Sequence, residues 1–426
     1  MTRRQHAVVW LSLVGIALLF WGLAPLQGYP PDMRAYKYWM VLVTEHGVGS
    51  AYSGEFPQTY SDYPPVFLYF LRAIGGGYQV LVDRTLDVQT AIADNRLSVA
   101  IKSPGIIFHL LLTLALIRIH QQEYGFKRAY FVAMVYGVHP AVVLDVAYWG
   151  QPDSIHTFFA VLGIRLLLRK QPLTGWAMLG LGAWTKAQTW WLLPLAGVLT
   201  LSQRSLRGVL EGLTALGIVS LIVTSPFVLQ GTFGELIQLP THMVTIHKFA
   251  SANANNLWWA ITEGGYRIDT EPWLGGISYA AWGYFFVALL GLLGVVAMLR
   301  VRREDVPEIF ALMTFGFVML ATKAHENHTF QTLGLLAAAG LFQGYRRLLF
   351  AAISMTLFMN LVLFSPDVFE WLKARLGHDA VISASVFNAR VNLLILALWL
   401  TMVAGKLRQG RSARAPSTAA VVVRDS

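Results

Sequence analysis

The sequence predicts an all-α protein that crosses a membrane about twelve times, and three observations carry this prediction. Of its 426 residues, 55% are hydrophobic and only 13% are charged, which differs from the composition of soluble domains. Apolar segments of membrane-spanning length recur along the chain. Basic residues gather in every second turn between these segments, as the positive-inside rule requires of cytoplasmic loops.

The spanning helices are expected wherever a window of about 20 residues is apolar. Such segments lie at residues 7–26, 97–118, 129–146, 152–168, 209–229, 273–299, 306–322, 328–344, 347–365 and 383–405. The stretch 173–201 carries Lys186 and Gln188 at its middle and basic residues on both flanks. We therefore expect two short helices there, joined by a polar hairpin on the far side of the membrane. This topology puts both termini in the cytoplasm.

The first apolar run is interpreted as an uncleaved anchor, because no small-x-small cleavage pattern follows it before Pro25. Residues 27–96 are expected to form one long outer loop with surface helices. Within this loop, the apolar piece 64–74 is too short to span, and the glycines at 75–77 are expected to interrupt it. Residues 1–408 then form a single membrane domain, and residues 409–426 form a disordered cytoplasmic tail.

Charge and cysteine content exclude several functional classes. The net charge of +10 is explained by basic cytoplasmic turns, so no nucleic-acid partner is expected. The absence of cysteine excludes disulfides and thiolate metal sites. No phosphate-binding glycine loop of the nucleotide-binding kind is found, which disfavours a nucleotide-sugar donor. No cofactor is expected.

The chemically active residues fall on one predicted face, the outer one. They come from Asp32, "SDYPPVF" (61–67), Lys102, "DVAYWGQPDS" (145–154), Lys186 with Gln188, "THMVTIHKF" (241–249), "SANANNLWW" (251–259) and "KAHENH" (323–328). Carboxylates, cations and aromatic rings together suit transfer of a sugar from a lipid phosphate. The same residues would suit a polysaccharide or lipid-linked sugar transporter or flippase, which needs no base.

Asp32 followed by "MRAYKYWMVLVTEHGVGSAYSGEF" and then "DYPPVFLYF" resembles the first outer loop of the GT-C superfamily of integral-membrane glycosyltransferases. "WGQPDS" and "HEN" are similar to further outer-loop signatures of that superfamily. The resemblance implies a polyprenyl-phosphate sugar donor and transfer on the non-cytoplasmic face. One eukaryotic branch of the superfamily extends N-glycan precursors with glucose and tends to have "GDYE" where this chain has "PPD", so the sugar and the acceptor are not carried over.

Asp32 is predicted to be the general base, since Asp62-Tyr63-Pro64-Pro65 follows it. The alternative role is an N-cap of the surface helix expected near Met33. For Asp62, a turn-forming role before the two prolines competes with substrate binding.

The "WGQPDS" stretch is predicted to bind substrate through Trp149, Gln151 and Asp153. Here Asp153 has the alternative role of a helix cap, and Trp149 that of an interfacial anchor. Tyr63, Gln188 and Glu326 complete the predicted substrate-binding set, with Glu326 orienting His325.

The donor phosphate is predicted to lie among Lys102, Lys186 and His325. Lys102 has an alternative role as a snorkelling lysine. His242, His247 and Lys248 form a weaker second set of candidate phosphate contacts. Asn253, Asn255 and Asn256 belong to the polar outer-face residues, and their alternative role is to shape the loop. The two histidines of "HENH" lack the spacing of the HExxH motif, so no metal is expected.

Together these inferences predict an inverting GT-C hexosyltransferase. It would move mannose or glucose from a polyprenyl-phosphate donor to a lipid-linked or cell-envelope acceptor hydroxyl. The predicted location is the bacterial plasma membrane, with the active site on its outer face.

Overall fold

The computed structural model describes residues 1–53 and 61–412, except for the side chains of residues 204, 205 and 409–412. Nearly all regular structure in these residues is helical. The only strands in the described part are β1 (Ser251–Ala252) and β2 (Ala324–His325), which pair in parallel. The predicted all-α class is therefore confirmed.

Helices occupy every segment in which a spanning helix was expected. They are α1 (Arg3–Leu23), α5 (Asn95–Gly137), α6 (Pro140–Val143) with η2 (Leu144–Trp149), α7 (Asp153–Leu168), α8 (Pro172–Ala183), α9 (Leu192–Leu229), α13 (Tyr279–Arg300), α14 (Val306–Leu320), α15 (Phe330–Ala339), α16 (Gly344–Leu363) and α18 (His378–Ser412). Within the described residues, six segments are long and apolar enough to cross a membrane, in α1, α5, α9, α13, α16 and α18. The polytopic fold is confirmed, whereas the count of twelve crossings stays a prediction.

Two of these helices contain a reversal of chain direction, at the basic turns that the sequence predicts. In α5, Gly125 has a φ of 76°, and the His109 ring lies 2.9 Å from the Gly137 carbonyl oxygen. Twenty-eight residues of straight helix would separate these two residues by about 40 Å. The chain therefore folds back at Gly125, next to "FKR".

The same argument applies to α9. The Trp176 indole nitrogen donates to Thr200 at 3.0 Å, and a Cβ added at Gly212 would lie 2.6 Å from that nitrogen. A straight helix would place residues 200 and 212 about 18 Å apart. The backbone must therefore turn back at "SQRSLR", as the topology prediction requires.

The predicted outer loop carries α2 (Pro30–Glu45), η1 (Val48–Tyr52), α3 (Pro65–Leu81) and α4 (Val88–Ala93). One expectation was wrong here: α3 runs through Gly75–Gly77 instead of stopping before them. Gly75 is tolerated because it packs directly against α2, where a Cβ would clash with the Thr44 hydroxyl at 2.0 Å. Close packing against a neighbouring helix offsets the low helix propensity of glycine.

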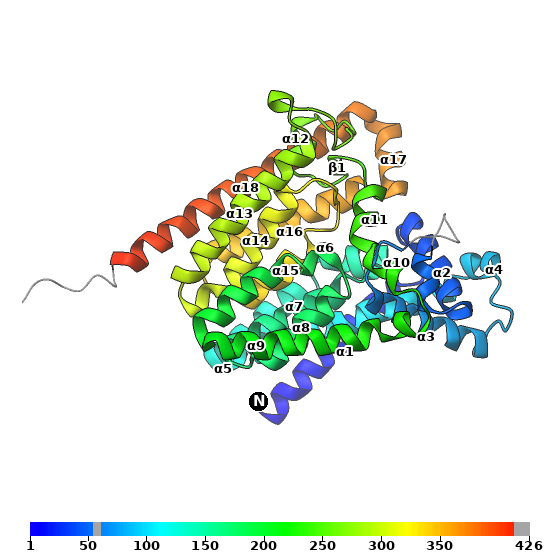
Figure 1. Ribbon diagram of the computed structural model, residues 1–426, viewed down its shortest axis with the longest axis horizontal. Coiled ribbons are helices and arrows are strands. Elements are labelled where there is room, and N and C mark those ends of the chain that lie inside the picture. Colours follow the sequence, from blue (N-terminus) through cyan, green and yellow to red (C-terminus); the bar gives the residue numbers. More distant parts are fainter. Residues whose placement is uncertain (54–60, 413–426) are drawn as a thin grey trace, which may run out of the picture.

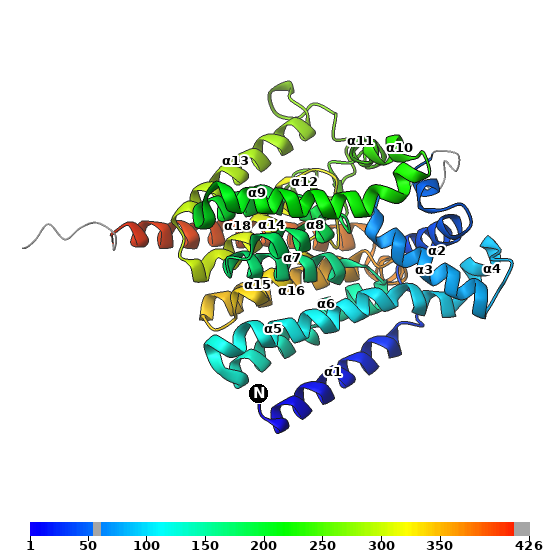
Figure 2. The same cartoon turned by 60° about the horizontal axis from the view of Figure 1, so that its bottom comes forward.

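The polar end of the molecule is built from several separate parts of the chain. Figure 1 shows α2, α3 and α4 together at one end of the helical bundle, next to α10 (Phe233–Ile237) and α11 (Leu239–Ile246). The helices α12 (Leu257–Ile261) and α17 (Pro366–Leu376) lie toward the same end. The short turn η4 (Leu274–Gly276) follows α12 in the chain. The first helix begins and the last helix ends at the opposite end in both Figure 1 and Figure 2.

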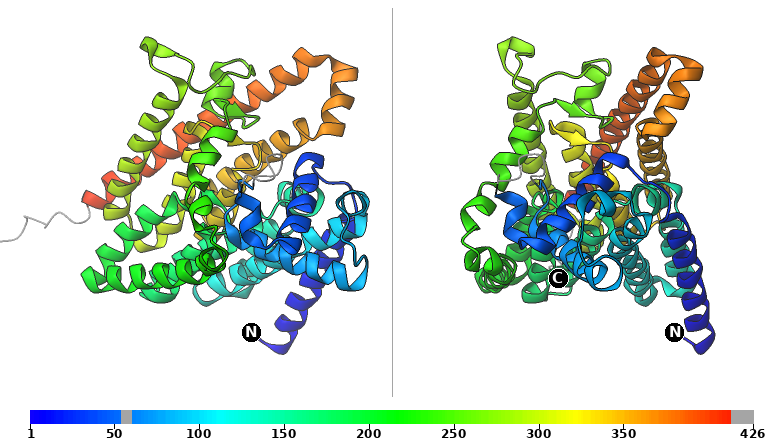
Figure 3. Two further views of the ribbon diagram at one scale, coloured as in Figure 1. Left: turned by 45° about the vertical axis from the view of Figure 1, so that its right-hand side comes forward. Right: turned by 90° about the vertical axis from the view of Figure 1, so that its right-hand side faces the viewer.

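The core of the bundle lies among α5, α7, α14, α15 and α16, whose buried residues form one large apolar cluster. Figure 3 shows α1 at the outside of the bundle, where it packs against α5.

The end opposite α2–α4 carries a buried ionic cluster. Arg346 pairs with Asp305 and Glu308, and Lys406 pairs with the same two carboxylates. This cluster joins α14 and its preceding turn η5 (Arg303–Asp305) to α16 and α18. α18 itself runs to Ser412, so residues 409–412 continue the helix, and the rest of the predicted tail lies outside the described residues.

Candidate active site

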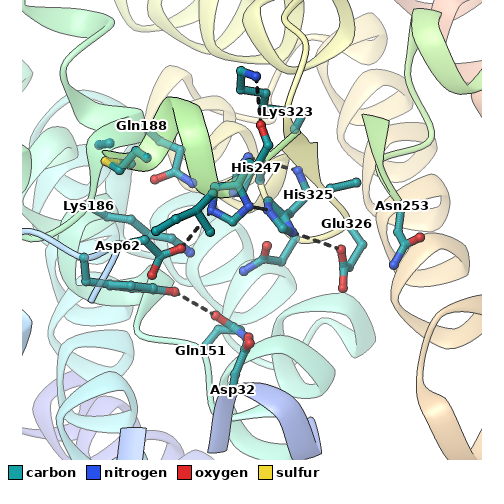
Figure 4. A pocket seen from close by; sticks show the side chains of 18 of the residues that line it. Asp32, Asp62, Gln151, Lys186, Gln188, His247, Asn253, Lys323, His325 and Glu326 are labelled. Atoms are coloured by element: carbon teal, nitrogen blue, oxygen red, sulfur yellow. Dashed lines mark hydrogen bonds and ion pairs between the residues drawn. The ribbon is translucent and has the colours of Figure 1, made fainter. Parts of the chain in front are cut away.

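A cavity of about 1130 Å³ opens at the polar end of the bundle. It is lined by residues from the first outer loop, the turn after η2, the turn around η3 (Ala187–Thr189), α11 and the segments next to β1 and β2. The predicted site residues that line it are Asp32, Asp62, Tyr63, Trp149, Gln151, Lys186, Gln188, His325 and Glu326. Figure 4 shows most of these side chains gathered around the space. Lys102 and Asp153 are predicted site residues that do not line it.

Asp32 lies in the first turn of α2 and faces the cavity. Its carboxylate accepts a hydrogen bond of 2.5 Å from the side-chain amide of Gln151. The N-cap residue of α2 is Tyr29, and no side chain caps this helix. The alternative role of Asp32 as an N-cap is therefore wrong, because its carboxylate is held by tertiary structure.

Gln151 is itself oriented by two tyrosines. Its side-chain oxygen accepts from the Tyr36 hydroxyl at 3.1 Å and from the Tyr63 hydroxyl at 3.3 Å. Since both donors engage the amide oxygen, the amide nitrogen must face Asp32. Burial raises the pKa of Asp32 to about 6, and the Gln151 hydrogen bond opposes this rise by favouring the ionised form.

Lys186 already has an ion-pair partner within the protein. Its ammonium pairs with Asp153, and both side chains are almost completely buried. Asp153 also accepts from Asn327 at 2.9 Å and contacts His156 at 3.3 Å. It therefore does not cap α7, whose N-cap Pro152 has no side-chain hydrogen bond. Lys186 reaches the cavity wall beside Tyr63, with its nitrogen 5.3 Å from the ring centroid.

Lys102 is only 1% exposed, and its ammonium donates to the carbonyls of Leu26 and Tyr148 at 2.9 and 2.8 Å. It neither snorkels nor faces the cavity; it joins the segment just after α1, at Leu26, to η2, at Tyr148. Trp149 is also buried. Its ring stacks on that of Tyr29 with the centroids 4.4 Å apart, and its indole nitrogen donates to the Ser365 hydroxyl. A membrane-interface role for Trp149 is therefore wrong.

A chain of polar contacts crosses the cavity from Asp62 to His325. Asp62 lies 3.0 Å from Nε2 of His247, and Nδ1 of His247 lies 3.1 Å from Nε2 of His325. Burial lowers the pKa of His325 to about 3, so this ring is neutral at physiological pH. The expected hydrogen bond from Glu326 to His325 is absent, because Nδ1 of His325 and Oε2 of Glu326 are 3.8 Å apart. His247, from the weaker predicted set, holds the position expected of Glu326.

The asparagines of "SANANNLWW" divide between two roles. Asn256 caps α12 by accepting from the Trp258 and Trp259 amides, and the Asn255 backbone amide donates to Asn360. Asn253 lines the cavity and has a φ of 63°. The Asn256 side chain thus has the loop-shaping role, whereas Asn255 makes this contact through its backbone. His242 and Lys248 are not among the residues that line the cavity.

Several cavity residues were missed by the sequence reasoning, namely Tyr29, Arg34, Tyr36, Trp39 and Tyr266. Arg34 is an exposed cation at the cavity wall, and it has no ion-pair partner among the residues that the structure describes. Its position two residues after the predicted base Asp32 could have indicated that it is a site residue. Over the same described part of the chain, no group of three or more His, Asp and Glu side chains is arranged to hold a metal ion.

The fold is shared with a solved membrane-protein structure. ArnT from Cupriavidus metallidurans, crystallised with undecaprenyl phosphate, matches 95% of this chain with a TM-score of 0.50. The match covers 78% of the ArnT chain at 15% sequence identity. At this identity the comparison shows the fold alone, and it confirms the predicted polytopic membrane architecture. Neither the protein-family models nor the curated proteins give a match.

Proposed function

We propose that this protein is a membrane glycosyltransferase that uses a polyprenyl-phosphate sugar as its donor. The observation that carries the proposal is the position of Asp32, a carboxylate held by Gln151 at the wall of a large cavity rich in aromatic side chains. The fold supports it, because the similar ArnT structure holds undecaprenyl phosphate. A lipid phosphate and a polar acceptor could both reach a cavity at the polar end of a membrane bundle.

Asp32 acts as the general base in this proposal. It takes the proton from an acceptor hydroxyl, and the oxygen attacks the anomeric carbon of the donor sugar. The bond between that carbon and the phosphate oxygen breaks, and the polyprenyl phosphate leaves with the electron pair. Attack opposite the leaving group inverts the anomeric centre, and a single carboxylate suffices for it.

The donor phosphate is proposed to lie near Lys186 and His325, with Arg34 as a further cation at the cavity wall. Lys186 acts as part of the buried pair with Asp153, so most of its charge is already compensated. His325 is neutral and offers at most one N–H group. Arg34 has no such partner in the described chain and offers a fork of donors suited to phosphate oxygens. Lys102, held by two carbonyls away from the cavity, is not part of this proposal.

The sugar is proposed to be a hexose, mannose or glucose, bound against Tyr63 and Trp149 and by the polar groups of Asp62 and Gln188. Aromatic faces and hydrogen-bonding side chains are the usual surfaces for sugar rings. The acceptor is a lipid-linked or cell-envelope glycan, and the reaction takes place at the outer face of a bacterial plasma membrane.

The direct test is to incubate the detergent-purified protein with a panel of polyprenyl-phosphate sugars and candidate acceptors. Consumption of one donor, with release of polyprenyl phosphate, is the expected result. A transporter or flippase would bind such lipids without consuming any of them. Binding of several donors with no turnover under any condition would therefore overturn the proposed reaction in favour of transport.

A further inference from the structure

Glu326 is a buried carboxyl group that faces the cavity without a cation to pair with. It is 5% exposed and lines the cavity, and its Oε2 atom has no hydrogen-bond partner in the described structure. The nearest ring nitrogen, Nδ1 of His325, is 3.8 Å away on a neutral imidazole. Figure 4 shows this carboxyl on the side of the cavity between His325 and Asn253.

The backbone around Glu326 is held firmly, so this position is built into the fold. Its carbonyl accepts from the side chain of Asn360 at 3.3 Å, and the same asparagine accepts from the Asn255 amide at 2.8 Å. The preceding residues Ala324 and His325 form β2, which pairs with β1. The pairing of β2 with β1 and the contacts with Asn255 and with Asn360 of α16 therefore fix the loop that carries the Glu326 carboxyl.

We propose that Glu326 works as an uncharged carboxylic acid that donates a hydrogen bond from its free oxygen to a phosphate oxygen of the lipid donor. This inference rests on the proposed function. A carboxylate at this place would repel a phosphate, whereas a protonated carboxyl supplies a donor without adding charge. The donor phosphate would then meet Glu326 and Arg34, while Asp32 remains free to accept a proton.

The titratable groups that interact with Glu326 include some that favour its neutral form and some that favour its ionised form. They are Tyr29, Asp32, Asp145, Lys186, Tyr266 and His325. The pKa of Glu326 is raised to about 8. Burial is the main cause and the negative charge of Asp32 adds to it, whereas hydrogen bonds from the Glu326 backbone amide and from Tyr29, and the charge of Lys186, oppose the rise. The pKa values of Tyr29 and Tyr266 are raised by burial, so neither ionises before Glu326. Asp32, with a pKa of about 6, is therefore ionised where Glu326 is still protonated.

The test measures binding of undecaprenyl phosphate to the detergent-purified protein from pH 7 to pH 9.5. For the wild type we expect the dissociation constant to rise about tenfold per pH unit above pH 8, because the carboxyl loses its proton. The phosphate monoester has its second pKa near 6, so it does not titrate in this range. Glu326→Gln keeps a neutral donor and should bind tightly with no alkaline loss. Glu326→Ala should bind at least tenfold more weakly at pH 7, with a flat profile.

Two controls separate folding and unrelated titration from the proposed contact. Melting curves identify any variant that is misfolded, and the near-isosteric Glu326→Gln keeps the test valid if Glu326→Ala unfolds. Glu370→Gln removes an exposed carboxylate on α17 and should keep the wild-type profile. The uncharged polyprenol, which lacks the phosphate, should show no dependence on Glu326.

Two results would overturn the inference. Glu326→Gln could retain the alkaline loss of the wild type, which would assign the titration to another group. Both Glu326 variants could bind undecaprenyl phosphate as the wild type does, which would remove Glu326 from phosphate binding and leave the proposed function standing. Absence of any binding by the wild type at any pH would instead refute the donor class, and this inference with it.

Discussion

The side-chain amide of Gln151 donates to the carboxylate of Asp32 across 2.5 Å, although the two residues are 119 positions apart in the chain. The contact joins the start of α2 to the turn that follows η2. It orients the carboxylate and favours its ionised form. A general base must be ionised before it can accept a proton. Gln151, from a different part of the fold, therefore orients Asp32 and stabilises the ionised form that this role requires.

Asp32→Asn should slow sugar transfer by about 10²–10⁴-fold, because the amide cannot accept the proton of the acceptor hydroxyl. The side chain keeps its size, so folding and donor binding should be retained. Initial rates, a melting curve and donor binding are measured on one preparation. Asp367→Asn, at an exposed position on α17, is the matched control and should be fully active. Normal turnover by a folded Asp32→Asn would remove Asp32 from the chemistry.

The pH profile of kcat/KM should have an acidic limb near pH 6, set by Asp32. Activity rises with pH through this limb, because the base works only when ionised. Gln151→Leu removes the hydrogen bond that lowers the pKa of Asp32, so the limb should move to higher pH. A limb that stays in place in Gln151→Leu would show that another group controls it.

Lys186→Met should destabilise the protein by about 3–5 kcal/mol, because it leaves the buried Asp153 carboxylate without its cation. Replacing both partners, in Lys186→Met with Asp153→Leu, should restore part of this loss. Thermal unfolding in detergent measures both effects. If the single variant melts at the wild-type temperature and only donor binding suffers, Lys186 is primarily a phosphate ligand.

The predicted orientation can be tested by labelling, because the chain contains no cysteine. Single cysteines are introduced at the exposed positions Gln89, on α4, and Lys127, in the turn next to Gly125. In intact cells an impermeant thiol reagent should label only the cysteine at position 89, since positive turns remain in the cytoplasm. Labelling at position 127 alone would invert the topology and place the cavity in the cytoplasm.

The order of helices, the chain reversals at basic turns and the grouping of polar motifs at one end were all predictable from the sequence. Hydropathy and charge act locally, since each helix must match the bilayer by its own composition and each basic turn is retained by its own charge. The continuation of α3 through Gly75–Gly77 was not predictable, because it depends on contact with Thr44 of another helix.

In the cavity, too, some features were predictable from the sequence and others depended on tertiary contacts. Residue type and motif were enough to select Asp32, Gln151, Lys186 and Glu326, but they could not assign partners. Only the tertiary structure pairs Lys186 with Asp153, turns Lys102 toward two carbonyls, and leaves Glu326 with a free oxygen. The physical reason is that the charge state and availability of a buried group depend on burial and on neighbours within a few ångströms, which come from distant parts of the chain.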